Sequence, residues 1–369
     1  MGSIINKKCV VVSAINFSEG GPLTVFRDCL SAAVALLPQD WNVIALVHNK
    51  KSFNQTRVQF IEFPKAKRSW LLRMSYEWIF FSKLSKKLKP DLWLSLHDIT
   101  PLVKVRRQAV YCHNPAPFYS MNWREIKMSP ALWVFTVLYK HLYRLFIKRN
   151  SHVIVQQEWL RDAFVKMYGK LPLVVAYPSV NIADNELQKK EIGHTHVFLY
   201  PSFPRVFKNF EVICEAAEIL EKRNVLNFEV RLTIDGSENS YSKWVFSKYK
   251  KIKNLNFIGL QSKNDLAKQY QASRTVIFPS KLETWGLPIS EAKLHKKALI
   301  LADLPYAHET VGCYDQVSYF PPTNATALAD IMQLIIENKW QPMGSQHDEP
   351  SQPFARNWDE LWLMLIKDL

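Results

Sequence analysis

Short apolar runs bounded by turn residues recur along the chain, and most of them are followed by a stretch with apolar residues at helical spacing. Such runs predict buried strands, and regular alternation of strand and helix predicts parallel sheets covered by helices. We therefore expect strands at 9–15, 41–47, 91–97, 108–113, 153–155, 174–178, 196–201, 230–234, 255–258, 276–280, 298–302 and 317–320.

The expected helices and one polar loop divide the chain. Helices are expected after the first strand up to about residue 37 and at 68–89, 129–149, 158–167, 210–221, 265–271, from 288 onward, 325–337 and 357–366, whereas 306–312 is expected to be a loop. The polar residues 178–191 mark the domain boundary. The prediction is an α/β protein with two facing, Rossmann-like, doubly wound parallel-sheet domains and a cleft between them. The first domain is expected at 1–180 and the second at 181–355. A C-terminal helix at 356–369 is expected to pack back on the first domain.

Composition fits two globular domains. The chain has 369 residues, above the size at which a single core usually stops growing, and 48% of them are apolar. Its five cysteines are scattered and include no C-x-x-C pair, which is typical of reduced thiols in a cytoplasmic protein. The first residues lack the layout of a signal peptide, and no apolar run approaches the roughly 20 residues that a spanning helix needs. We expect a cytoplasmic protein.

The net charge of +15 belongs to the first half of the chain. Residues 1–185 contain 26 Lys and Arg against 11 Asp and Glu, whereas residues 186–369 contain 22 of each kind. The aromatic, basic stretch 68–89 fits a helix on an anionic membrane surface or a packed helix with a solvated basic face. We expect an acidic partner for this half: anionic lipid, a phosphorylated acceptor or nucleic acid. Because the sequence shows no recognisable nucleic-acid-binding motif, nucleic acid is not expected.

The stretch Lys281-Leu-Glu283-Thr-Trp-Gly-Leu-Pro288-Ile-Ser-Glu291-Ala carries two carboxylates eight positions apart. Pro288 fits the first position of a helix, because proline has no N–H to leave unpaired there. Glu283 is then expected on the loop before the helix and Glu291 in its first turn. Helix N-termini favour anions, so the pattern suits a phosphate-bearing ligand. Taken singly, each glutamate also fits a solvated loop residue or a complement to the helix dipole.

Further candidates stand where expected strands end. Gly20-Gly21 follow the first strand without a G-x-G-x-x-G pattern, which argues against a dinucleotide fingerprint. His113 lies at the end of the strand 108–113, the end at which open parallel sheets bind ligands. Arg205 and Lys208 precede a helix with Asn209 as its expected N-cap, where two cations and free N–H groups suit a diphosphate. Each candidate also has a purely structural interpretation. Gly20-Gly21 could form a simple tight turn, His113 could hydrogen-bond only to its neighbours, and Arg205 and Lys208 could be isolated basic loop residues.

These features together resemble the retaining glycosyltransferases of family 4, which have the GT-B fold. The resemblance rests on Glu283-x7-Glu291 within E-T-W-G-L-P-I-S-E-A. It is supported by Gly20-Gly21, His113, the Arg205/Lys208 pair and the segments 153–159 and 309–312. It covers nearly the whole chain and is strongest over 196–330.

Some residues depart from the family pattern. Arg205 and Lys208 are closer together than the usual pair, and Trp285 stands where Phe is usual. Lys296-Lys297 replace small residues, and Asp235-Gly-Ser237 stands in place of a more glycine-rich turn.

The resemblance implies that a UDP- or GDP-linked sugar binds mostly to the second domain, without a metal ion or other cofactor. It implies that Glu291 binds the ribose, Glu283 the donor sugar, and Arg205 with Lys208 the diphosphate. By the same resemblance Gly20-Gly21 close over the phosphates and His113 contacts the sugar. The implied catalytic residues are Glu283, His113, Lys208 and Arg205; the implied donor-binding residues are Gly20, Gly21, Arg205, Lys208, Glu283, Thr284, Trp285, Gly286, Leu287 and Glu291.

The implied reaction is transfer of a hexose or deoxyhexose to a saccharide acceptor in bacterial O-antigen, capsule or exopolysaccharide synthesis. A lipid-linked acceptor at the cytoplasmic face of the inner membrane suits the basic, aromatic first domain, which would bind the anionic membrane surface. Three alternatives remain: a soluble GT-B transferase acting on a small molecule or a glucan, another GT-B enzyme such as a phosphorylase or epimerase, and a basic nucleic-acid-binding protein.

Overall fold

The computed structural model describes residues 7–17, 20–53, 55–179 and 195–369. The chain divides into two compact units. The first consists of Met1–Phe118, Thr136–Ser179 and Pro350–Leu369, and the second of Tyr119–Phe135 and Val180–Glu349. The expected boundary at residues 180 and 181 falls in 180–194, outside the described residues. The sequence did not predict that 119–135 would join the second unit.

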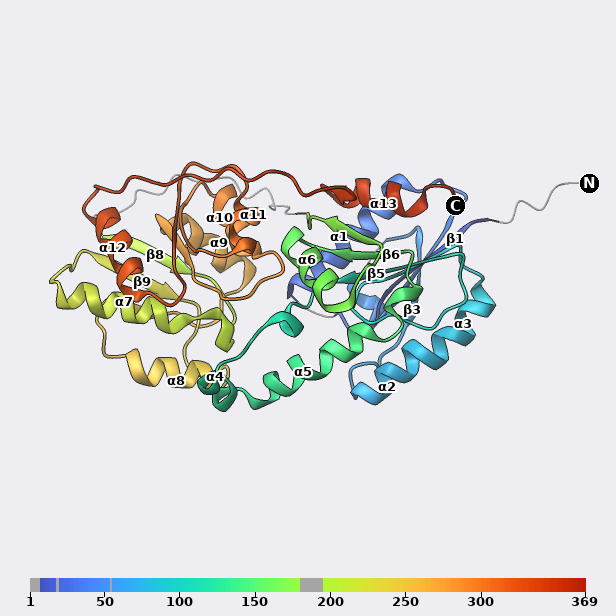
Figure 1. Cartoon of the computed structure of the whole chain (residues 1–369), viewed down its shortest axis with the longest axis horizontal. Coiled ribbons are helices and arrows are strands. Elements are labelled where there is room, and N and C mark those ends of the chain that lie inside the picture. Colours follow the sequence, from blue (N-terminus) through green and yellow to red (C-terminus); the bar gives the residue numbers. More distant parts are fainter. Residues whose placement is uncertain (1–6, 18–19, 54, 180–194) are drawn as a thin grey trace, which may run out of the picture. The chain divides into compact units, whose positions relative to one another are not determined.

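The first unit contains an eight-stranded sheet (Figure 1). Its strands are β1 Cys9–Ala14, β2 Asn42–Val47, β3 Val58–Glu62, β4 Leu92–Ser95, β5 Arg107–Cys112, β6 His152–Val155, β7 Leu173–Ala176 and β14 Phe354–Ala355. They are ordered β14-β7-β6-β5-β4-β1-β2-β3, and every described pair is parallel. Ligand-binding side chains are therefore expected beyond the carboxyl ends of these strands, which meet at one edge.

Helices cover both faces of this sheet. Its helical segments are α1 Gly20–Leu36, η1 Lys50–Ser52, α2 Trp70–Ser75, the π-helical η2 Tyr76–Phe80, α3 Phe81–Leu88, η3 Ala116–Phe118, α5 Pro130–Arg144, η4 Ile147–Arg149, α6 Glu158–Tyr168 and α13 Trp358–Ile366, of which α5 begins in residues assigned to the second unit. Val10 and Val12 pack with α1 and α13, whereas Val11 packs with Phe81 of α3 on the opposite face. In Figure 1, α1 and α13 accordingly lie on one side of the sheet and α2 and α3 on the other. Trp362 of α13 donates its Nε1–H to Cys29 O of α1 at 3.0 Å.

The second unit contains a six-stranded sheet. Its strands are β8 His196–Tyr200, β9 Phe228–Leu232, β10 Leu255–Phe257, β11 Thr275–Phe278, β12 Ala298–Ala302 and β13 Val317–Phe320. They are ordered β10-β9-β8-β11-β12-β13, again with all described pairs parallel. Its helical segments are α4 Trp123–Met128, η5 Val206–Lys208, α7 Phe210–Lys222, α8 Ser240–Tyr249, α9 Lys263–Ala272, α10 Leu287–Leu294, α11 Pro305–Val311 and α12 Ala325–Ile336. The predicted alternation of strand and helix, and the two parallel sheets, are confirmed.

Two local predictions are wrong, and a third is right only in position. The expected loop at 306–312 is the helix α11, which Pro305 begins and Gly312, with φ +58°, ends. Asn209 does stand at the N-cap position of α7, but in a left-handed conformation and without the expected capping hydrogen bond; its side-chain amide donates to Pro279 O and Pro322 O. Glu291 is the fifth residue of α10, not part of its first turn, because Leu287 starts this helix.

The single helix expected at 68–89 is interrupted. It runs through α2 into the π-helical turn Tyr76–Phe80 and then into α3. π-Helical turns are rare and often found at functional sites. This one carries Glu77, a fully buried carboxylate.

Candidate functional site

The two-glutamate stretch spans the end of the loop between β11 and α10, which carries Glu283, and the start of α10, which carries Glu291. Trp285 is buried and donates Nε1–H to Ser290 Oγ at 3.0 Å, which ties the loop to the first turn of α10. Gly286 has φ +83°, and a Cβ at this position would lie 3.3 Å from both Ile289 Cδ1 and Phe278 Cε1. A residue without a side chain is therefore required where this loop enters the helix.

Lys208 and Glu283 are brought together by this loop. The Lys208 ammonium forms an ion pair with Glu283 Oε1, and the two side chains are 17% and 13% exposed. The ammonium also lies 5.6 Å from the Phe278 ring centroid and 5.7 Å from that of Phe207. A cation and a carboxylate that are partly shielded from water, yet still accessible, have the chemistry to bind a phosphate and a sugar hydroxyl respectively.

Arg205 is placed differently from Lys208. It is exposed, and no described side chain forms a hydrogen bond or ion pair with its guanidinium. It lines a cavity of about 260 Å³ together with Phe203, Tyr241 and Met128. Arg205 and Lys208 are thus neighbours along η5, but the structure joins only Lys208 to Glu283.

Glu291 has its own partner. Its Oε2 accepts a hydrogen bond from the Tyr270 hydroxyl at 2.8 Å. Burial, reinforced by the Glu291 charge, raises the pKa of Tyr270 well above its usual value, so the phenol remains a donor. Among the described residues, no hydrogen bond or ion pair joins Glu291 to the Lys208–Glu283 pair.

A segment from the first half of the sequence borders this loop. Glu125 of α4 is buried and forms an ion pair with Lys281, whose Nζ lies 3.1 Å from Glu125 Oε1. Lys281 is two residues before Glu283 in the sequence. The backbone N–H of Lys281 donates a hydrogen bond to the carbonyl oxygen of Phe207 at 2.7 Å, and Phe207 directly precedes Lys208. The Tyr119 ring contacts that of Phe207, with centroids 6.0 Å apart. Residues 119–135 therefore hold both chain segments that carry the Lys208–Glu283 pair.

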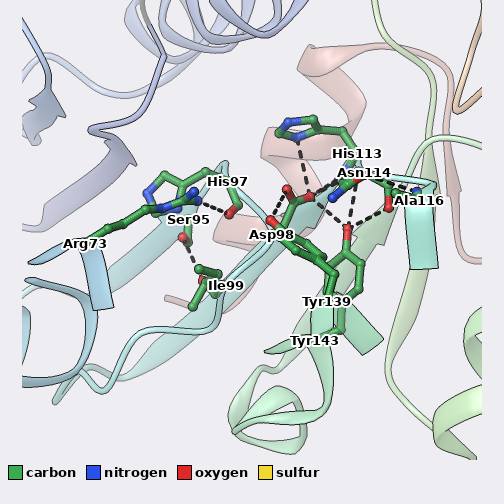
Figure 2. A network of polar contacts seen from close by, with 10 residues as sticks. All are labelled: Arg73, Ser95, His97, Asp98, Ile99, His113, Asn114, Ala116, Tyr139 and Tyr143. Atoms are coloured by element: carbon green, nitrogen blue, oxygen red, sulfur yellow. Dashed lines mark hydrogen bonds and ion pairs between the residues drawn. The ribbon is translucent and has the colours of Figure 1, made fainter. Parts of the chain in front are cut away.

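The first unit has a second polar cluster, at the carboxyl ends of β4 and β5 (Figure 2). His113 directly follows β5, and Asp98 stands three residues after β4 with φ +70°. Asp98 is 6% exposed. Its Oδ1 accepts hydrogen bonds from the backbone N–H groups of His113 and Asn114, at 2.8 and 3.2 Å. Gly20 and Gly21, the first residues of α1, follow β1 of the same sheet.

Two tyrosines of α5 complete the Asp98 cluster. The Tyr143 hydroxyl donates to Asp98 Oδ1 and the Tyr139 hydroxyl to Asp98 Oδ2, both at 2.9 Å. Burial and then the charge of Asp98 raise the pKa of both phenols well above the usual value. The tyrosines therefore remain neutral donors to the carboxylate.

A third cluster surrounds His97, two residues after β4. His97 Nε2 lies 3.2 Å from Glu77 Oε1 and 3.1 Å from Ser13 Oγ, and Arg73 donates to His97 O at 2.9 Å. Burial raises the pKa of Glu77 to about 8, although the Arg73 charge opposes the shift. Burial, followed by Arg73, lowers the pKa of His97 well below its usual value. Both groups therefore favour their neutral forms near pH 7.

Comparison with known proteins identifies the second half. Residues 184–351 match the family model described as "Glycosyl transferases group 1". This part of the chain is a group 1 glycosyltransferase domain. The O-antigen chain mannosyltransferase RfbU of Salmonella typhimurium is 25% identical over 240 residues, which span 63% of this chain and 62% of that relative.

Solved structures share the fold of the whole chain. WaaG, a glycosyltransferase involved in lipopolysaccharide biosynthesis, aligns with a TM-score of 0.65 at 14% identity, covering 89% of this chain and 90% of WaaG. HepE of Anabaena in complex with UDP-glucose aligns with a TM-score of 0.63 at 15% identity, covering 89% of this chain and 90% of HepE. With two parallel-sheet α/β units, these likenesses identify the fold as GT-B, which confirms the predicted fold class.

Within the glycosyltransferase domain lie Glu283, Glu291, Lys208, Arg205 and the loop residues Thr284, Trp285, Gly286 and Leu287; His113, Gly20 and Gly21 lie in the other unit. Among the described residues, no group of three or more His, Cys, Asp or Glu side chains is placed to hold a metal ion. In the described part of the chain, no helix combines the length and the apolar character needed to cross a membrane.

Four residues around these sites were missed from the sequence: Asp98, Glu77, Glu125 and Tyr270. Asp98 directly follows His97 at the end of an expected strand, which was a usable signal. Glu77 lies between Tyr76 and Trp78 in an apolar stretch, where a lone carboxylate also deserved notice. Glu125 had a local signal, its capping box with Asn122, but its ion pair with Lys281, 156 positions away, had none. Tyr270 gave no local signal, because its partner Glu291 is 21 positions away.

Proposed function

We propose that this chain is a retaining, metal-independent glycosyltransferase of family 4, which transfers a hexose or deoxyhexose from a nucleotide-diphosphate sugar to a saccharide acceptor. The observation that carries the proposal is the Lys208–Glu283 ion pair on the two-glutamate loop of the group 1 domain. The pair places a cation and a carboxylate side by side. The diphosphate of a nucleotide sugar requires a cation, and its sugar hydroxyls require a hydrogen-bond acceptor.

Each side chain has a distinct role in the proposed reaction. On donor binding, Lys208 pairs with the diphosphate and stabilises the charge that grows on the leaving group, as preorganised cations do. Arg205, exposed on the same turn, provides a second cation for the diphosphate. Glu283 accepts hydrogen bonds from the donor sugar, and Glu291, oriented by Tyr270, accepts them from the ribose. The acceptor attacks from the face that the diphosphate leaves, so the anomeric configuration is retained.

The residues of the first unit complete this assignment. His113 contacts the donor sugar, and the N–H groups at the start of α1, where Gly20 and Gly21 leave room for close approach, bind the phosphates.

A donor screen followed by product analysis tests the proposal. Thermal shift measurements with UDP- and GDP-sugars should identify one donor that raises the melting temperature more than the free nucleotide does. Proton NMR of the product formed with that donor should show the anomeric configuration of the donor. An inverted product would refute the retaining mechanism, and no stabilisation by any nucleotide sugar would refute the donor site.

The proposed acceptor is a lipid-linked saccharide of O-antigen or a related surface polysaccharide, at the cytoplasmic face of the inner membrane. The functions of RfbU, an O-antigen chain mannosyltransferase, and of WaaG, which is involved in lipopolysaccharide biosynthesis, support this class of acceptor. So do the large apolar side chains exposed on the basic first unit, notably Leu71, Ile79 and Phe80, which are 77%, 60% and 44% exposed. Exposed lysines follow them at Lys83, Lys86 and Lys87.

Vesicle sedimentation separates this acceptor class from a soluble one. Vesicles with anionic lipid should sediment the protein at moderate salt, and neutral vesicles should sediment less of it, because each basic residue near an anionic surface adds binding energy. Failure to bind either kind of vesicle would favour a transferase that acts on a small molecule or a glucan.

A further inference from the structure

Asp98 joins three elements through one buried carboxylate. Its Oδ1 accepts hydrogen bonds from two backbone N–H groups after β5 and from Tyr143 of α5, and its Oδ2 accepts one from Tyr139. Tyr143 also donates to Asn114 O at 3.1 Å, which ties the same loop to α5. The position of the loop that begins with His113 therefore depends on Asp98 (Figure 2).

The imidazole of His113 faces the same carboxylate. Its Nδ1 lies 3.7 Å from Asp98 Oδ1, and this nitrogen is buried without a hydrogen-bond partner. The ring packs edge-on against Phe17, with centroids 5.3 Å apart, and near Tyr111, at 6.3 Å. The side chain as a whole is 19% exposed, so the ring is held on one side and open on another.

We propose that Asp98 is a positioning residue for His113, holding the imidazole in the tautomer that carries its proton on Nδ1 and keeping Nε2 as a hydrogen-bond acceptor. A neutral imidazole has one N–H and one acceptor nitrogen, and the partner of one nitrogen decides the role of the other. An acceptor-only carboxylate beside Nδ1 draws the proton there. This inference rests on the proposed function, in which His113 contacts the donor sugar and Nε2 accepts a hydrogen bond from one of its hydroxyls.

The other groups around the ring do not supply a competing charge next to it. Burial raises the pKa of three neighbouring phenols and lowers that of one imidazole, so these groups are neutral at pH 7: Tyr111, Tyr139, Tyr143 and His97. The nearby cation Arg73 donates to the backbone oxygen of His97. Asp98 is thus the acidic group that faces His113 among the described residues.

The test is to read the tautomer of His113 directly. Full-length protein labelled with ¹⁵N-histidine reports through its ring ¹⁵N shifts which nitrogen carries the proton, and His113→Gln assigns the signal. In the wild type we expect the Nδ1–H tautomer. Asp98→Asn keeps the shape of the side chain and an oxygen that can accept hydrogen bonds from the loop. In this variant we expect the population of the Nε2–H tautomer to increase. In the same variant kcat should fall at least about tenfold while the donor KM stays within about threefold.

The matched control is Tyr139→Phe, which removes the hydrogen bond to Oδ2 and leaves Oδ1, the atom that faces His113. It should keep the wild-type tautomer and a kcat within about twofold. The inference is overturned by an Nε2–H tautomer in the wild type, by an unchanged tautomer in Asp98→Asn, or by a changed tautomer with unchanged kcat. If Asp98→Asn fails to fold, the wild-type tautomer alone decides. Absence of sugar transfer by the wild type would instead refute the proposed function, leaving the tautomer measurement interpretable.

Discussion

Lys208 and Glu283, 75 positions apart in the sequence, form an ion pair on the loop that leads into α10. Each neutralises the other in a place where both are less than one-fifth exposed. In the proposed reaction, a bound nucleotide sugar divides the pair between its diphosphate and its sugar, so removal of either charge should affect both stability and turnover.

Lys208→Met tests the cation. We expect kcat/KM to fall about 100-fold or more, because the variant loses the preorganised cation that stabilises the negative charge growing on the leaving group. The free energy of unfolding should fall by about 1–2 kcal/mol, less than the roughly 3–5 kcal/mol for a fully buried pair, because Glu283 retains some contact with water. Initial rates with saturating acceptor and urea unfolding measure the two effects.

Lys251→Met is the control for Lys208→Met, since Lys251 is an exposed lysine of the same domain. It should change neither quantity measurably. Glu283→Gln should also lower turnover steeply while the fold stays intact. Near-wild-type rates in Lys208→Met or Glu283→Gln would remove that residue from the mechanism.

Glu291→Gln tests the second glutamate. A contact with the ribose is present in both ground state and transition state, so its loss should raise the donor KM about tenfold with little change in kcat. Calorimetric titration with the free nucleotide should show the same loss of affinity. Tyr270→Phe, which leaves the carboxylate but removes its 2.8 Å donor, should show a smaller loss. Unchanged nucleotide affinity in Glu291→Gln would contradict the ribose assignment.

The sequence predicted the fold well because most strands of both sheets are buried on both faces. β1 and β8, for example, are buried along their whole length, which is why they appear as continuous apolar runs. β3, Val58–Glu62, was missed because it lies at the sheet edge and is partly exposed. α8 was missed because its buried residues include Ser242 and two tyrosines, so no apolar stripe marks it.

The candidate site was predictable only where its chemistry is local in sequence. Glu283, Gly286 and Glu291 lie within one short stretch, which forms the loop after β11 and the start of α10. Asp98 binds a loop 15 positions away and tyrosines 41 and 45 positions away, contacts that depend on the pairing of β4 with β5 and on the packing of α5. Side-chain hydrogen bonds between distant elements leave no periodic signal in the sequence.

Gly286→Ala should destabilise the glycosyltransferase domain. The substitution introduces a side chain at φ +83° and places its Cβ 3.3 Å from Ile289 and Phe278. We expect a loss of about 1–3 kcal/mol in the free energy of unfolding from backbone strain and crowding together. Ile289→Val is the matched background, because it removes Cδ1, one of the two crowding atoms, and leaves the backbone of Gly286 unchanged. An equal loss from Gly286→Ala in the wild-type and Ile289→Val backgrounds would show that crowding against Ile289 contributes nothing.

The Glu77–His97 contact predicts how stability depends on pH. The pKa of Glu77 is about 8 in the folded protein, above its unfolded value near 4.5, so the folded state binds one more proton between these two values. This lowers stability as pH rises from about 4.5 to about 8. His97 has a lowered folded pKa, so it raises stability as pH rises toward its usual value of 6.5. The two effects oppose each other below pH 6.5, and the Glu77 effect alone remains above it.

We therefore expect the free energy of unfolding to fall by about 2 kcal/mol between pH 6.5 and 8, at about 1.4 kcal/mol per pH unit for one proton. Denaturant unfolding at constant ionic strength across this range measures the slope. Glu77→Gln, which cannot ionise, should remove the decline, whereas Glu218→Gln, at an exposed position of α7, should keep it. A decline of the same size in Glu77→Gln would show that Glu77 already carries its charge in the folded protein at pH 6.5.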